Sequence, residues 1–204
     1  MTFLRLSVLV SALVLSAPIC AEAQPSPVPS RIRGTIERAD GSLLTVKARD
    51  GSDLQLRVPD NVPVSGIERI TLADIKPGTF IGVAAMPQAD GSQKALSVHL
   101  FPESMRGTGE GFRPWDLRPN STMTNATVDQ RVTANDGEHL TVKYKGGEKT
   151  VVVTPETPIV TYAPGNVAEL VPGAKIIAFV NRRSDGSLEA SRIGVGRNGL
   201  TPPM

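Results

Sequence analysis

Hydrophobic and polar residues alternate along short stretches of this chain, which is the pattern of half-buried β-strands. Between Leu43 and Arg49, the apolar residues Leu44, Val46 and Ala48 occupy every second position. Asp50-Gly51 follows, a pair that tolerates the positive φ angles of tight hairpin turns. The same pattern predicts further strands at residues 31–37, 54–58, 79–86 and 94–100.

The second half of the chain repeats the first. Leu44-Thr45-Val46-Lys47 recurs as Leu140-Thr141-Val142-Lys143, Lys76-Pro77-Gly78 as Val171-Pro172-Gly173, and Asp90-Gly91-Ser92 as Asp185-Gly186-Ser187. The offsets are 96, 95 and 95 residues, and three ordered matches at one offset indicate an internal duplication. Strands in the second copy are predicted at residues 126–133, 140–145, 149–153, 175–181 and 188–195.

Each copy therefore has five strands, with one helical turn or short helix between the third and fourth, at residues 72–75 and 166–170. A five-stranded Greek-key barrel of the oligonucleotide/oligosaccharide-binding (OB) type requires this order. The predicted fold class is all-β, with two tandem five-stranded OB-like barrel modules. A five-stranded sandwich or one larger closed barrel remains open for the same strands.

The N-terminus has the features of a signal peptide. Arg5 supplies a basic start, residues 6–15 are almost wholly apolar, and Ala21-Glu22-Ala23 places small residues where a signal peptidase cleaves. We expect cleavage after Ala23 and a periplasmic or secreted mature chain. Cys20, the one cysteine, then leaves with this segment, which excludes disulfides and thiolate chemistry. A lipoprotein anchored at Cys20 is the alternative, although Pro18-Ile19 fits a lipobox poorly.

The predicted organisation has six parts. They are a signal peptide (1–23), a proline-rich spacer (24–30), a first repeat (31–100), a linker (101–125), a second repeat (126–196) and a C-terminal tail (197–204). No segment after the signal peptide is apolar enough to span a membrane.

The repeated order of turn and core residues resembles that of a known family. The order G-x-I, L-L-T-V, D-G-x-x-L-x-L-x-V, L-A-D-I-K-P-G and D-G-S is similar to a bacterial exported OB-like repeat classified as a domain of unknown function. The resemblance covers residues 31–100 and 126–195, and it implies an OB-like β fold rather than a chemistry. Members are sometimes labelled metal-transporter permeases, but a chain without membrane spans is not itself a permease.

Charge and composition argue against several functions. The formal net charge is +2 and the aromatic content is 4%, which suits neither a polyanion partner nor the aromatic strand face of a nucleic-acid-binding barrel. The two histidines, His99 and His139, lie in predicted strands outside any nucleophile motif, and we expect them to be exposed or partly packed. We therefore expect no enzymatic activity, no cofactor and no nucleic-acid partner.

The linker is unusual because it is rich in aromatic residues and arginines. Flexible linkers avoid large apolar side chains, so this one is expected to dock on the protein. One interpretation is that Trp115 and Phe112 fill the groove between the two modules. The other is a binding site for a partner or an anionic or sugar-like ligand, formed by Trp115, Phe112, Arg113, Arg118 and Arg106.

Metal binding is a separate hypothesis. His99, Met86, Met105 and Met123 offer soft ligands of the kind that copper prefers, but no His-x-His or Met-x-Met motif groups them. The leading expectation is a non-catalytic periplasmic binding or scaffold protein for an envelope protein or small ligand. The alternative is a periplasmic metal-binding accessory protein associated with metal transport.

Overall fold

Residues 30–204 are described by the computed structural model, and they form an all-β fold of thirteen strands. The predicted signal peptide and nearly all of the spacer lie outside the described residues. The strands are β1 (Arg31–Asp40), β2 (Leu43–Ala48), β3 (Asp53–Arg57), β4 (Val64–Arg69), β5 (Phe80–Pro87), β6 (Gln93–Leu100), β7 (Gly111–Pro114), β8 (Thr122–Ala134), β9 (Gly137–Tyr144), β10 (Gly147–Val153), β11 (Ile159–Pro164), β12 (Lys175–Arg182) and β13 (Leu188–Gly196). Three single-turn 3₁₀ helices complete the described part: η1 (Leu72–Asp74), η2 (Glu103–Met105) and η3 (Val167–Glu169).

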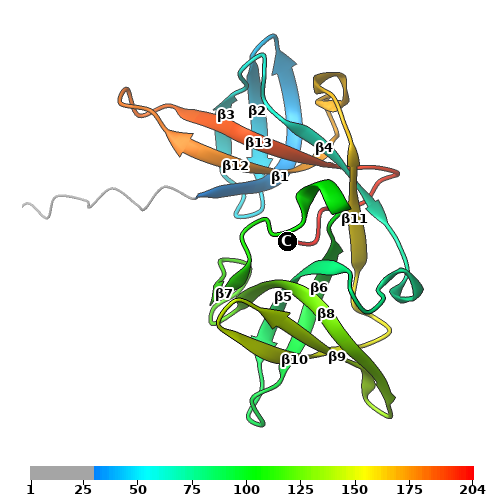
Figure 1. Cartoon of the computed structure of the whole chain (residues 1–204). Coiled ribbons are helices and arrows are strands. Elements are labelled where there is room, and N and C mark those ends of the chain that lie inside the picture. Colours follow the sequence, from blue (N-terminus) through cyan, green and yellow to red (C-terminus); the bar gives the residue numbers. More distant parts are fainter. Residues whose placement is uncertain (1–29) are drawn as a thin grey trace, which may run out of the picture.

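Strand pairing closes two five-stranded barrels (Figure 1). Barrel A consists of β1, β2, β3, β13 and β12, and barrel B of β8, β9, β10, β6 and β5. In barrel A, a short parallel contact between β3 and β13 completes a ring of otherwise antiparallel pairs. Barrel B closes in the same way through a parallel contact between β10 and β6. The predicted closed barrel is therefore confirmed.

The barrels do not coincide with the two sequence repeats. Barrel A takes three strands from the first repeat and two from the second, and barrel B does the reverse. Each repeat has thus exchanged its last two strands with the other, and two tandem modules are not confirmed. The physical reason lies in β4 and β11, which we did not predict as strands.

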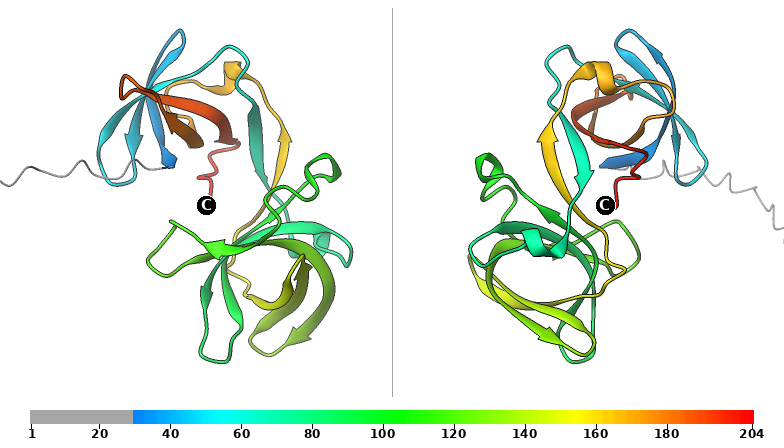
Figure 2. Two further views of the ribbon diagram at one scale, coloured as in Figure 1. Left: turned by 60° about the vertical axis from the view of Figure 1, so that its left-hand side comes forward. Right: turned by 90° about the vertical axis from the view of Figure 1, so that its right-hand side faces the viewer.

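The strands β4 and β11 cross from one barrel to the other (Figure 2). They pair antiparallel with each other, and the pair Ile67–Tyr162 sits at their centre. These two residues are 95 positions apart, the offset of the duplication, so an approximate two-fold axis relating the repeats passes through this pair. Because β4 and β11 are extended and run to the other barrel, the last two strands of each repeat cannot return to its first three and instead join the other barrel.

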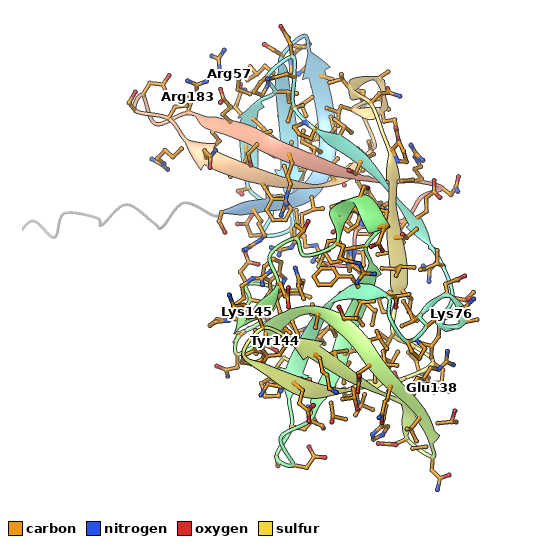
Figure 3. The ribbon with its side chains drawn as sticks, viewed as in Figure 1. Arg57, Lys76, Glu138, Tyr144, Lys145 and Arg183 are labelled. Carbon is orange, nitrogen blue, oxygen red and sulfur yellow. The ribbon has the colours of Figure 1, made fainter. Side chains whose placement is uncertain are left out.

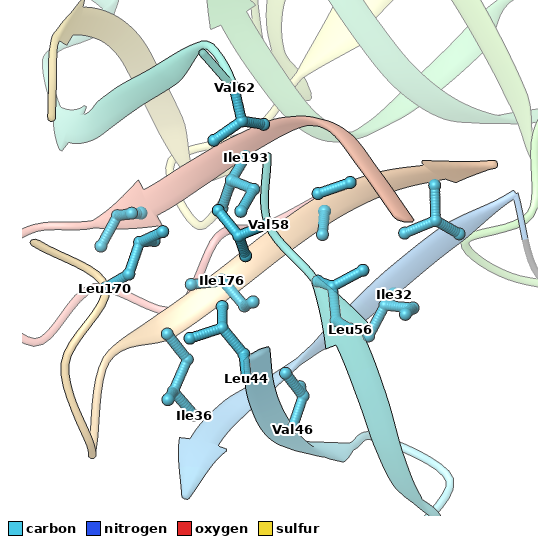
Figure 4. Packing of buried hydrophobic residues seen from close by; sticks show 14 residues of the cluster. Ile32, Ile36, Leu44, Val46, Leu56, Val58, Val62, Leu170, Ile176 and Ile193 are labelled. Atoms are coloured by element: carbon cyan, nitrogen blue, oxygen red, sulfur yellow. The ribbon is translucent and has the colours of Figure 1, made fainter. Parts of the chain in front are cut away.

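Each barrel is filled by side chains from both repeats. The core of barrel A contains fourteen buried residues, seven from each repeat (Figure 4). Ile36, Leu44 and Leu56 from the first repeat meet Ile176 and Ile193 from the second. Barrel B has an equivalent core, which includes Ile81 and Val98 from the first repeat and Leu140 from the second. Neither repeat buries its apolar surface without the other.

An Asp-Gly-Ser turn with the same hydrogen bonds occurs twice in the first repeat and once in the second. In the Asp50-Gly51-Ser52, Asp90-Gly91-Ser92 and Asp185-Gly186-Ser187 turns, the aspartate accepts hydrogen bonds from the serine N–H and hydroxyl. Each glycine adopts a positive φ of 84–88°, which an L side chain rarely tolerates. These interactions explain why the hairpins were readable from the sequence.

The second repeat begins earlier than expected. Residues 122–125, assigned to the linker from the sequence, are the first part of β8 and pair with β5. The segment between the repeats is therefore residues 101–121, and its short strand β7 adds to the edge of β8. No helix in the described part of the chain is long and apolar enough to cross a membrane.

Candidate ligand-binding pocket between the barrels

A pocket of about 390 Å³ lies between the two barrels. Its wall on barrel A is formed by β12 and β13 with Ile177, Phe179 and Arg192, and barrel B contributes Met123 and Asn125 of β8. The crossing strands, the linker and the C-terminal tail complete it. The residues from these segments are Pro63, Ser65, Tyr162, Phe101, Met105, Thr108, Gly109, Arg113, Trp115 and Met204.

The linker and the tail both reach into this region. Trp115 packs against an apolar cluster between the barrels that includes Met123, Ile177 and Met204. Figure 2 shows the C-terminal segment running between the barrels, where Met204 is buried. The pocket is therefore enclosed by segments that are far apart in the sequence.

Equivalent positions in the two repeats carry different residues at the pocket. On barrel A, Phe179 of β12 pairs with Arg192 of β13, and both line the pocket. The matching pair on barrel B is Ala84 and Ser97. The ring and the guanidinium therefore occur on one side only, and the pocket breaks the two-fold symmetry of the fold.

One carboxylate, Asp116, lies in the linker beside the pocket. Arg33 and Arg31 form ion pairs with it at 2.7 and 2.9 Å. Burial opposes the ionisation of Asp116, but these two hydrogen-bonded arginines outweigh it and hold its pKa below the usual value. The Arg31 guanidinium also stacks on Trp115, 3.7 Å from the ring centre. These contacts fix the tryptophan at the pocket.

Two further arginines in the pocket have no carboxylate partner within residues 30–204: Arg113 and Arg192. Arg113 donates to the Gly109 carbonyl at 2.7 Å. Arg192 lies 3.6 Å over the Phe179 ring while part of it stays open to solvent. Desolvation lowers the pKa of both, and the neighbouring charge of Arg31 lowers it further in each case.

Of the five linker residues predicted to bind, the structure brings Trp115 and Arg113 to the pocket. Phe112 points away from it and is 41% exposed, with Lys149 4.7 Å over its ring, so the expectation that it fills the groove is wrong. Arg106 is exposed and paired with Glu103, and Arg118 is exposed. Neither of these two arginines lines the pocket.

Sequence reasoning missed Arg192, Phe179 and Asn125. All three lie in strands. There the alternating pattern predicts which face of the sheet a side chain is on, but not which residues it contacts. The sequence did contain a signal for Arg192, because alignment of the two repeats places this arginine at the position equivalent to Ser97. Unlike residues at equivalent positions of a duplicated fold mark the places where the copies have diverged.

The four residues proposed for a metal do not come together. Met105 and Met123 line the pocket, but Met86 lies at the end of β5, paired with Lys94. His99 is 1% exposed, so the expectation of an exposed or partly packed histidine is wrong for it. The described residues contain no group of three or more His, Cys, Asp or Glu suited to a metal ion.

His99 is held in an apolar environment next to the ring of Tyr162, 5.6 Å away between ring centres. Neither ring nitrogen has a hydrogen-bond partner in the described structure, and desolvation lowers its pKa to about 3. It is a neutral packing residue at neutral pH. His139 Nε2 forms a hydrogen bond with Asp136 Oδ1 at 2.8 Å.

Residues 131–194 match a family described as "Domain of unknown function (DUF5666)". This agrees with the resemblance of the repeat motifs in the second of the two regions that carry it. The match runs from β8 to β13, so it covers one sequence repeat whose strands are divided between both barrels. No curated protein and no solved structure matches the chain significantly.

Proposed function

We propose that this chain is a non-catalytic binding protein whose pocket between the barrels holds a small ligand. The observation that carries the proposal is the pocket's construction. Its walls come from both barrels, the two crossing strands, the linker and the tail, and these segments enclose a volume of about 390 Å³. Ligand pockets of this size, mostly apolar with a few polar groups, are typical of small-molecule sites.

The side chains in the pocket are suited to holding a molecule. Among the described residues, the side chains that line it include no carboxylate, imidazole or thiol. Burial raises the pKa of Tyr162 to about 12, so its hydroxyl stays neutral. These groups provide contacts and hydrogen bonds rather than proton transfer near neutral pH.

Trp115 makes the proposal testable, because it is the single tryptophan of the chain and lines the pocket. The test titrates neutral 2-naphthamide and follows Trp115 fluorescence and calorimetric heat. A Thr108→Phe variant places a ring at the half-buried pocket rim, and Thr150→Phe on the exposed face of β10 is the matched control. Saturable binding that is weakened by Thr108→Phe and kept by Thr150→Phe supports the proposal. Binding equal in all three proteins contradicts it, and so does absence of binding of both this probe and its anionic counterpart 2-naphthoate.

We also infer that each barrel is an OB-type barrel assembled by strand exchange. The order around barrel A is β1-β2-β3-β13-β12, and the contact between β3 and β13 is parallel. In terms of position along the chain this is 1-2-3-5-4, a five-stranded Greek-key order. The shape of the fold carries no function by itself.

The metal-binding alternative has one supporting observation: Met105, Met123 and Met204 line the same pocket. Against it, Arg113 and Arg192 bring positive charge that opposes a cation there. Titration of Cu(I) in the same fluorescence assay decides between them. Stoichiometric copper binding lost in Met105→Leu would favour the accessory-protein function.

The expected periplasmic or secreted location is likewise a proposal, supported by the pattern of residues 1–23. Mass spectrometry of the chain recovered from the periplasm of an expressing bacterium tests it. A mature chain starting at Gln24 is expected, and an uncleaved chain would contradict the proposal.

A further inference from the structure

Positive charge exceeds negative charge around the pocket. Arg31, Arg33, Arg113 and Arg192 lie in or beside it, whereas Asp116 is the one side-chain carboxylate that pairs with any of them. The C-terminal residue Met204 also lines the pocket, and within residues 30–204 its carboxylate forms no ion pair with these arginines. Asp116 is shared by Arg31 and Arg33, which leaves Arg113 and Arg192 without a counter-ion among residues 30–204. Repulsion between these cations destabilises the empty pocket and is relieved when an anion enters.

The arginines are held in place for such an anion. The Arg192 guanidinium carbon lies over the Phe179 ring, and Arg113 is held by its bond to the Gly109 carbonyl and lies 5.6 Å from the Trp115 ring centre. A guanidinium with part of its donor edge free pairs well with a planar oxyanion. Arranging these side chains before the ligand arrives lowers the entropy cost of binding.

A second, independent observation concerns Asn125. This residue lines the pocket, is 5% exposed, and donates its amide N–H to the Thr108 carbonyl at 2.8 Å. Its side-chain oxygen is buried and has no hydrogen-bond partner in the described structure. Buried acceptors are normally satisfied, so this oxygen, which faces Gly82, leaves one unfilled hydrogen bond in the wall of the pocket.

The rest of the wall is apolar and partly aromatic. Phe101, Trp115, Tyr162 and Phe179 line the pocket, and the rings of Phe101 and Tyr162 lie 5.5 Å apart. Flat rings stack well on such surfaces. At about 30 Å³ for each water-sized group, a pocket of about 390 Å³ has room for roughly a dozen non-hydrogen atoms.

We propose that the ligand is a small, flat, largely apolar molecule that carries one oxyanion, a carboxylate or a phosphate, bound between Arg113 and Arg192. This inference rests on the proposed binding function and adds the chemical class of the ligand. The oxyanion pairs with the two arginines, and the apolar body lies against the aromatic wall.

The experiment compares three naphthalene probes of nearly equal size: anionic 2-naphthoate, neutral 2-naphthamide and cationic 2-naphthylmethylammonium. Binding to the full chain is measured by calorimetry and Trp115 fluorescence. We expect naphthoate to bind at least about tenfold more tightly than the amide, and the ammonium probe to bind more weakly than both. Phenyl phosphate is then compared with benzoate, which distinguishes phosphate from carboxylate preference.

The matched variants separate a local site from overall charge. Arg113→Gln/Arg192→Gln is expected to reduce naphthoate affinity to that of the amide. The control Arg57→Gln/Arg182→Gln removes the same charge from exposed positions of β3 and β12; Arg57 lies at the outer end of barrel A, away from barrel B (Figure 3). This control is expected to keep the tenfold preference, and circular dichroism confirms that each variant is folded.

The outcomes distinguish this inference from the proposed function. If naphthoate and naphthamide bind equally and Thr108→Phe blocks both, the anion inference is wrong and the binding function stands. If the pocket-arginine pair and the exposed pair lose naphthoate affinity equally, the attraction is non-local and the inference is also wrong. If neither probe binds, or Thr108→Phe has no effect on either, the proposed function itself fails.

Discussion

Cutting the chain between its two repeats is expected to leave it whole in solution. Arg106 and Gly107 are exposed and lie in the segment that joins the repeats outside both barrels. A protease site inserted between Arg106 and Gly107 allows this cut after folding. Because each barrel contains strands of both repeats, neither fragment retains a complete barrel.

The magnitude follows from the two cores. Among the residues that the second repeat gives to barrel A are five large apolar ones, Leu170, Ile176, Val180, Ile193 and Val195; the first repeat gives barrel B four, Ile75, Ile81, Val83 and Val98. At about 2 kcal/mol for each buried side chain, their burial contributes about 18 kcal/mol. Association costs roughly 4–15 kcal/mol, so a mid-range cost leaves about 8 kcal/mol, a dissociation constant near ~1 μM. Strand pairing between the repeats adds to this value.

Size-exclusion chromatography and native mass spectrometry of the cut protein at about 20 μM (well above ~1 μM) provide the assay. One species of the uncut mass is expected under native conditions, and two fragments after denaturation. Both fragments should unfold at a single urea midpoint. Two tandem barrels would instead separate into two folded fragments, each with its own β-sheet circular dichroism, and that result would refute the strand exchange.

Three further variants test other parts of the structure. His99→Leu removes a buried group whose folded pKa of about 3 lies below the ordinary 6.5. The unfolded chain therefore takes up the proton first, so the wild-type protein loses stability as pH falls from about 6.5 towards 3, by about 3 kcal/mol at pH 4.5. Urea midpoints at pH 7 and 4.5 should show a smaller loss of stability in the variant. An equal loss contradicts the assignment of this pH dependence to His99. Gly194→Ala places a Cβ 2.7 Å from Ile67 Cδ1, so the free energy of unfolding should fall by about 1–3 kcal/mol. The melting temperature should fall with it, and an unchanged melting temperature contradicts this. Arg197→Gln removes the ion pairs to Glu68 of β4 and Glu169 of η3 that hold the start of the C-terminal tail. Hydrogen exchange of residues 198–204 should therefore accelerate while the barrels keep their protection, and uniform acceleration would contradict a local role.

The pocket depended on contacts that the sequence does not show. Trp115 stood out because a large aromatic residue is unusual in a linker, and the structure places it beside the pocket. Phe112, three positions earlier in the same linker, faces outward from the short strand β7. Only the pairing of β7 with β8 decides which side chains of this segment face the barrels.

What the sequence determined by itself was local. The alternation of apolar residues and the Asp-Gly-Ser turns set the strands and hairpins, because both depend on residues within a few positions of one another. The duplication was likewise visible as repeated residues. The all-β class and the closed barrel followed from these features.

Which strands share a barrel was decided only by the tertiary structure. Since the repeats have the same strand pattern, β5 and β6 have suitable partners in either β1–β3 or β8–β10, and local chemistry does not choose between them. The choice is made by β4 and β11, whose pairing at Ile67–Tyr162 joins residues 95 positions apart. That long-range contact also aligns unlike residues of the two repeats, and so forms the pocket lined by Arg113 and Arg192.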